Sequence, residues 1–120
     1  MAGFIYFSPK NGVSLGSSAI DIIADYLRPY ITSVSKDTME EIYETYDLYD
    51  QTLDFSKLPK AVYMQCYEQI KKAIEIDLKT NPVINNHPQD WMFRAWYDEI
   101  KPKMQASPLY DPELLVKRPD

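Results

Sequence analysis

Residues 56–79 read SKLPKAVYMQCYEQIKKAIEIDLK and predict the longest helix of the chain. Apolar side chains recur at intervals of three and four, as on one face of an α-helix, while Lys and Glu occupy the opposite face. Pro59 falls in the first turn, where its missing N–H costs little. A mainly helical fold follows from this stretch. The apolar face carries Leu58, Val62, Cys66, Ile70 and Ala73, widened by Tyr63, Tyr67 and Ile74.

Two further helices are bounded by prolines. The first covers residues 18–28, because Ser18 opens it with a capping signal and Pro29 disfavours helical geometry in the residue before it. The other covers residues 89–101 and is expected to end or kink at Pro102.

The segments between the helices carry short apolar runs or turn residues. Residues 4–7 are an apolar run ended by Ser8-Pro9 and predict one buried strand. The other segments are expected to form a loop at 10–17, a short strand or ordered loop at 48–55, a polar turn at 81–88 and an irregular Pro-rich tail at 106–120, in which 114–116 would dock on the core.

These segments together predict a mainly α fold. We expect a compact single domain over residues 1–120, with about four helices and room for one or two short strands. An α+β fold is the second choice.

Residues 37–54 carry seven acidic side chains and no Lys or Arg, although the net charge of the whole chain is only −5. Asp37 can cap a helix here, with Glu40 completing a capping-box pattern. On that helix the apolar side chains share an inward side and most of the acids form an outward stripe. The inward side chains are Met39, Ile42, Tyr43 and Tyr46.

The acidic stripe works against the stability of its own helix. Like charges at spacings of three and four repel each other, and Glu44 and Asp47 lie near the negative end of the helix dipole. A solvated helix face normally mixes both signs of charge, so this pattern favours a binding surface for a basic partner.

The rest of the composition limits the classes of function that we expect. The single Cys66 excludes an internal disulfide and suits a reducing, cytoplasmic location. With His87 as the single histidine, no transition-metal shell is expected, and no cofactor either. The N-terminus lacks the features of a signal peptide, and no apolar run is long enough to span a membrane. The acidic balance argues against nucleic acid or an anionic membrane as the partner.

Other chemistry is weakly indicated. Asp47, Asp50 and Asp54 lack the alternating acids and the central glycine of a calcium loop. Outward acids are poor general acids or bases, because burial is what shifts a carboxyl pKa toward neutrality. The aromatic residues within 91–97 are expected to be mainly core, with part of the cluster exposed. We therefore expect no enzymatic activity.

Residues 46–73, YDLYDQTLDFSKLPKAVYMQCYEQIKKA, resemble small bacterial immunity proteins of contact-dependent growth inhibition systems. The likeness consists of an acidic-aromatic segment, a short ordered stretch, a Ser-x-Leu helix start at Ser56 and then a helix rich in Tyr and Phe. It implies a non-enzymatic cytosolic inhibitor that binds one toxin domain, often a nuclease, and blocks its active site. Such families have no catalytic residues to carry over.

The hypothesis is therefore that acids and a tyrosine bind the Lys and Arg side chains of a basic toxin. One alternative is an inhibitor from a phage or mobile element that mimics nucleic acid. Another is a small enzyme or ligand-binding domain with the aromatic cluster as its pocket. The predicted partner-binding residues are Glu40, Glu41, Glu44, Asp47, Tyr49, Asp50 and Asp54.

Overall fold

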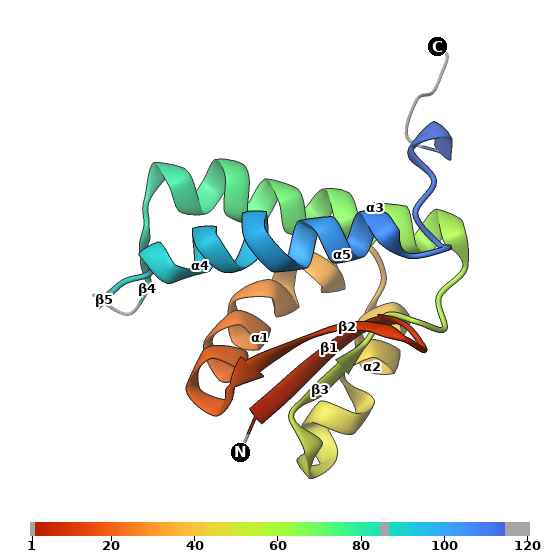
Figure 1. The fold of residues 1–120 in the computed structure, drawn as a ribbon, viewed down its shortest axis with the longest axis horizontal. Coiled ribbons are helices and arrows are strands. Elements are labelled where there is room, and N and C mark those ends of the chain that lie inside the picture. Colours follow the sequence, from red (N-terminus) through yellow and green to blue (C-terminus); the bar gives the residue numbers. More distant parts are fainter. Residues whose placement is uncertain (1, 85–86, 115–120) are drawn as a thin grey trace.

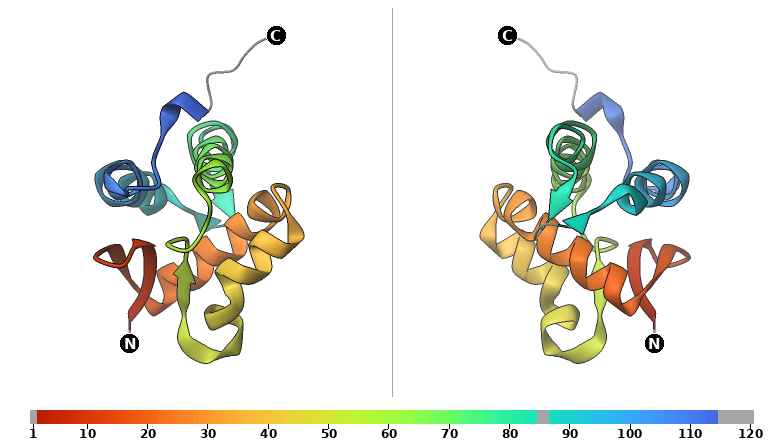
Figure 2. Two further views of the ribbon diagram at one scale, coloured as in Figure 1. Left: turned by 90° about the vertical axis from the view of Figure 1, so that its right-hand side faces the viewer. Right: turned by 90° about the vertical axis from the view of Figure 1, so that its left-hand side faces the viewer.

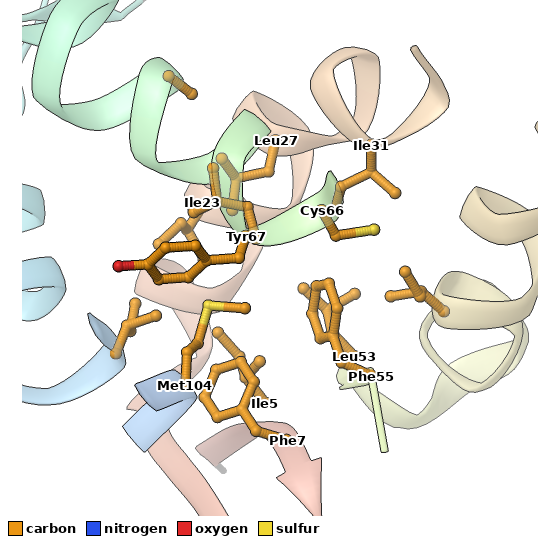
Figure 3. Packing of buried hydrophobic residues seen from close by; sticks show 14 of the residues in the cluster. Ile5, Phe7, Ile23, Leu27, Ile31, Leu53, Phe55, Cys66, Tyr67 and Met104 are labelled. Atoms are coloured by element: carbon orange, nitrogen blue, oxygen red, sulfur yellow. The ribbon is translucent and has the colours of Figure 1, made fainter. Parts of the chain in front are cut away.

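The computed structural model describes residues 2–84 and 87–114, and it does not describe the side chains of Ala2, Tyr49, Asp50 and His87. One continuous hydrophobic core joins the described helices and the main sheet. Figure 3 shows side chains from both the sheet and the helices converging on it, among them Phe7, Leu27, Phe55 and Met104. The expected mainly α, compact fold with short strands is confirmed.

The main sheet has three strands in the order β2-β1-β3. The central strand β1 (Ala2–Ser8) pairs antiparallel with β2 (Asn11–Gly16) and parallel with β3 (Thr52–Asp54). Ile5 and Phe7 are buried whereas Phe4 is exposed, which is the alternation of a sheet with one face on the core.

Strand β2 corrects the expectation of a loop at residues 10–17. The chain turns at Pro9 and Lys10, so Gly12 lies within the strand. A side chain at Gly12 would place its Cβ 2.7 Å from the carbonyl oxygen of Ile5, so the glycine allows a close approach between strands. The burial of Val13 opposite Ile5 makes this pairing favourable.

The first helix, α1 (Ser17–Thr32), passes through Pro29 and does not end before it. Proline removes one N–H from the helix, but Leu27 and Ile31 on either side of it are buried in the core. The helix resumes at once, because the N–H of Ser33 donates to the carbonyl of Pro29 at 3.0 Å. Tertiary packing outweighs the local preference of the residue before proline.

The second helix, α2 (Lys36–Thr45), continues as a wider π-helical turn, η1 (Tyr46–Asp50). Its N-cap is Ser35 and not Asp37, since the hydroxyl of Ser35 accepts a hydrogen bond from the N–H of Thr38 at 3.1 Å. Asp37 lies in the first turn, where its charge favours the positive end of the helix dipole.

Two long helical rods lie antiparallel and side by side (Figures 1 and 2). The first is α3 (Lys60–Lys71), which continues as η2 (Lys72–Leu78). The second is α4 (Asp90–Ala95), η3 (Trp96–Ile100) and α5 (Lys101–Ala106), and a ribbon of β4 (Val83–Ile84) and β5 (His87–Pro88) lies between the rods in the sequence.

The second rod does not end at Pro102. The turn before this proline is π-helical, and the N–H of Lys101 donates to the carbonyl of Trp96. A widened turn of this kind accommodates the break in α-helical bonding that a proline imposes. The rod is also tied to the first one, because Glu75 accepts hydrogen bonds from the Trp96 Nε1 at 2.7 Å and the Lys101 Nζ at 2.9 Å.

The first rod starts four residues later than expected, at Lys60 instead of residue 56. Asp54 holds residue 56 in a turn, since its Oδ1 accepts hydrogen bonds from the Ser56 N–H at 2.9 Å and hydroxyl at 2.6 Å. Leu58 is buried, but from this turn and not from the helix.

The C-terminal segment packs on the core through different residues from those expected. Leu109 and Tyr110 contact the core, and the Tyr110 ring lies edge-on to Tyr67 at 5.2 Å between centroids. Leu114, in the short helix η4 (Pro112–Leu114), is exposed, so it does not dock. Residues 115 and 116 lie outside the described part of the chain.

The capping assignment predicts different costs for two substitutions. Ser35→Ala should lower the free energy of unfolding by about 1 kcal/mol, because it leaves the Thr38 N–H without its acceptor. Asp37→Asn should cost only about 0.3–0.5 kcal/mol, since it removes only a dipole interaction. Urea unfolding of both variants measures this, and a larger cost for Asp37→Asn would show that the cap is misassigned.

Candidate functional site

Helix α2 turns three glutamates away from the core. Ile42 and Tyr43 are buried, as the periodicity predicted, and Glu40, Glu41 and Glu44 lie exposed on the other side. None of the three glutamates forms an ion pair with another residue in the described part of the chain. These three predicted binding residues are therefore available to a partner.

Asp47 differs from the other acids, because it is already paired. The Arg28 guanidinium donates two hydrogen bonds to its carboxylate, at 2.6 and 3.1 Å. These hydrogen bonds hold the pKa of Asp47 below its usual range. Arg28 also lies over the ring of Tyr43 at 4.2 Å, so Asp47 helps to fix α2 against α1.

Asp54 does not belong to the candidate site, and the side chains of two other predicted residues are not placed. Asp54 is half-buried and holds Ser56 in the turn before α3, which is a structural role. The backbone of Tyr49 and Asp50 forms the end of η1, but their side chains lie outside the described residues.

The structure adds two acids that the sequence analysis did not assign. Asp21 and Asp25 are exposed on α1, one helical turn apart. Tyr46 and Gln51 donate hydrogen bonds to Asp21 at 2.6 and 3.0 Å, and these bonds lower its pKa. Because Tyr46 belongs to η1, the Asp21 contact joins the acids of α1 to those of α2. The i, i+4 spacing on the polar face of α1 was the signal that would have found them.

We use the name α1–α2 acidic surface for six exposed acids of α1, α2 and η1. It comprises Asp21, Asp25, Glu40, Glu41, Glu44 and Asp47. Residues 17–50 hold eight acidic and two basic residues, Arg28 and Lys36. Figure 2 shows α1 beside α2 and its continuation η1, and the Arg28–Asp47 and Tyr46–Asp21 contacts join α1 to η1.

A groove of about 450 Å³ lies along the exposed side of α1. Tyr26 and Tyr30 face it with ring centroids 5.6 Å apart, and their hydroxyls are committed to η2: Tyr26 donates to the Ala73 carbonyl at 2.7 Å and Tyr30 to the Asp77 carboxylate at 2.6 Å. Burial raises the pKa of both tyrosines. The lining residues are Asp21, Ile22, Asp25, Tyr26, Pro29, Tyr30 and Ile84.

The aromatic cluster at residues 91–97 is divided between the core and the surface. Trp96 is fully buried and Tyr97 is exposed, so the expected partial exposure is confirmed. A hollow of about 240 Å³ lies between Phe93, Tyr97 and Lys79. Among the described residues that line it, none is a carboxylate, a thiol or an imidazole, so beyond apolar contact it offers the Lys79 ammonium and the Tyr97 hydroxyl.

Two other features bear on chemistry. Cys66 is buried, as expected for a small core residue, and burial raises the pKa of its thiol to about 12, which makes it a poor nucleophile. Within residues 2–84 and 87–114, no three His, Cys, Asp or Glu side chains lie together as metal ligands would.

Comparisons with models of known protein families, with characterised proteins and with solved structures give no match. Among the described helices, none combines the length and the apolar character needed to cross a bilayer.

Because Asp47 is paired and Glu44 is not, neutralising the two side chains should have different effects on the free energy of unfolding. Asp47→Asn should lower the free energy of unfolding at neutral pH by about 0.5–1 kcal/mol, a range suited to an exposed pair. A depressed folded-state pKa contributes stability above the unfolded pKa of about 4, and this stability is lost as the pH falls through the folded value. The gap between wild type and variant should therefore close in acid, as urea unfolding from neutral pH downward would measure.

The matched control is Glu44→Gln, which removes one unpaired exposed charge from the same surface. It should leave stability unchanged or raise it slightly, because it relieves repulsion from Glu40 and Glu41. Equal losses for Asp47→Asn and Glu44→Gln would contradict the assignment of Asp47 as the paired acid.

Proposed function

We propose that this protein is a non-enzymatic binding protein that neutralises a basic partner protein through the α1–α2 acidic surface. The observation that carries the proposal is the state of Glu40, Glu41 and Glu44, which are exposed on one helix and unpaired within the described residues. Their mutual repulsion lowers the stability of α2, so folding does not account for them. A partner that brings Lys and Arg side chains would convert this repulsion into attraction.

The surface suits rapid and specific association. Clustered charge of one sign steers an oppositely charged partner and raises the association rate, and this gain falls as salt shortens the Debye length. Both helices are fixed to the core, α2 through Ile42 and Tyr43 and α1 through Ile23 and Leu27. The acids therefore need little ordering on binding, which reduces the entropic cost of association.

A toxin domain that acts on nucleic acid is the partner class that fits this surface best. Such a domain carries Lys and Arg at its phosphate-binding site, and an acidic surface that covers this site would block it. The resemblance of residues 46–73 to bacterial immunity proteins supports the same partner class and a cytoplasmic place of action. The Ser-x-Leu part of that resemblance is weakened, because Ser56 lies in a turn and not at the start of the helix.

Affinity capture from the native host, at low and at high salt, tests the proposal. The expected result is a basic toxin, encoded beside this chain, that is retained at low salt and whose activity is inhibited by the purified protein. Capture of a host defence nuclease would instead favour a nucleic-acid mimic. Strong thermal stabilisation by a nucleotide, a metal ion or a small acid would contradict the binding proposal.

Charge reversal tests the surface itself. The triple variant Glu40→Lys, Glu41→Lys, Glu44→Lys should slow association with the captured partner by roughly tenfold to a hundredfold at low salt. The effect should shrink at high salt because the steering is screened. Stopped-flow or surface plasmon resonance kinetics measure both rates.

The matched control is Asp98→Lys, Glu99→Lys, Glu113→Lys, which makes the same change in net charge at exposed positions outside α1 and α2. It should alter the association rate much less. If the two triple variants slow association equally, net charge alone matters and the α1–α2 acidic surface is not the contact.

A further inference from the structure

We propose that the groove along α1 receives an arginine side chain of the basic partner, with its guanidinium on the carboxylate of Asp25 and against the ring of Tyr26. This inference rests on the proposed function and assigns a specific position within it. The binding residues that the sequence predicts lie within residues 40–54, and the groove lies outside that segment.

The charge in the groove favours a cation. Among the described residues, its lining holds two carboxylates, Asp21 and Asp25, and no basic side chain. Asp21 is already occupied by hydrogen bonds from Tyr46 and Gln51. Asp25 makes no hydrogen bond or ion pair through its side chain with any other described residue, so it is the acceptor that remains for a ligand.

Other charged groups lie near Asp25 but do not neutralise it. Arg28 lines the adjoining hollow of about 550 Å³, which shares Asp25 and Pro29 with the groove, and its guanidinium donates to Asp47. Lys72 and Asp77, on η2 behind Tyr30, form an ion pair at 3.5 Å with each other. Arg28, Lys72 and Asp77 therefore pair with other groups, and no described residue occupies the carboxylate oxygens of Asp25 with a hydrogen bond or an ion pair.

The backbone adds a second acceptor at the same residue. In an α-helix the carbonyl of residue 25 accepts from the N–H of residue 29, but Pro29 has no N–H. The Asp25 carbonyl therefore lacks its α-helical donor, next to the Asp25 carboxylate. A guanidinium carries five N–H donors in a planar fork and can satisfy a carboxylate and a neighbouring carbonyl together, which the compact ammonium of lysine does less well.

The aromatic lining provides a stacking surface. Because the hydroxyls of Tyr26 and Tyr30 are hydrogen-bonded to η2, the rings are held in place. Lys72 lies 5.7 Å from the centre of the Tyr30 ring, whereas no described cation lies over Tyr26. A guanidinium on the Tyr26 ring would gain cation–π and stacking energy, which again favours arginine over lysine.

A peptide titration of the full chain tests the inference. The probes are hexa-arginine and hexalysine peptides, and the readouts are the dissociation constant and the NMR shifts of the tyrosine rings. We expect hexa-arginine to bind several times more tightly than hexalysine and to shift the Tyr26 ring. Asp25→Asn should weaken hexa-arginine binding about tenfold, as loss of a charged hydrogen-bond acceptor does.

The matched control is Glu99→Gln, which removes one exposed acid from the second rod. Equal weakening by Asp25→Asn and Glu99→Gln, or equal affinity for the two peptides, would overturn the arginine site. The arginine site can fail while the proposed function stands. This is the case if Asp25→Asn weakens binding no more than the control does, but the variant Glu40→Lys, Glu41→Lys, Glu44→Lys binds hexa-arginine less tightly than the wild type. Absence of any binding by either peptide would contradict both proposals. Circular dichroism confirms that Asp25→Asn, a surface change, leaves the fold intact.

Discussion

The buried side chain of Tyr43 joins the two helices on which the acidic surface depends. Its hydroxyl donates to the Ala24 carbonyl of α1 at 2.7 Å, its ring lies beneath the Arg28 guanidinium at 4.2 Å, and Tyr46 meets it edge-on at 5.9 Å. Burial raises the pKa of Tyr43, so it remains a neutral donor at any physiological pH. Because these contacts fix which side of α2 faces inward, they also fix which side carries the glutamates. Tyr43 and Tyr46 therefore hold in place the helix that carries the glutamates.

Arg28 resolves part of the electrostatic conflict that the surface creates. Acids on two adjacent helices repel each other across the helix contact as well as along each helix. Arg28 of α1 lies between the helices and pairs with Asp47 of η1. Tyr46 of η1 in turn donates a hydrogen bond to Asp21 of α1. Asp47 and Asp21 are thus compensated, whereas Glu40, Glu41, Glu44 and Asp25 have no ion pair or side-chain hydrogen bond within the described residues. The contacts between the helices therefore compensate two acids of the surface and leave the exposed charge of the other four in place.

The hydrophobic periodicity of the sequence correctly predicted features whose packing follows from their own residues. It failed where contacts with residues far along the chain decide the structure. The inward side of α2 was predicted because Met39, Ile42, Tyr43 and Tyr46 recur at helical spacing. The continuation of α1 through Pro29 was not, since it depends on the burial of Leu27 and Ile31 by other elements. Strand β2 depends on its pairing with β1, which turn signals at residues 11 and 12 concealed. In the candidate site, exposure of three glutamates followed from the pattern, whereas the pairing of Asp47 with Arg28, 19 positions away, has no local signature.

A binding surface built on two helices has a consequence for how it discriminates between partners. Loops can adapt to many shapes, but α1 and α2 hold their acids at fixed spacings, set by the helical repeat and by the Tyr43 junction. A basic partner with a different arrangement of Lys and Arg would leave some carboxylates unpaired next to desolvated surface, which is costly. The proposed arginine site sharpens this constraint, because a carboxylate, a carbonyl without its α-helical donor and an aromatic ring favour a planar cation over a point charge. In the proposed function, overall negative charge would attract any basic protein, and the fixed geometry of α1 and α2 would select among those that it attracts.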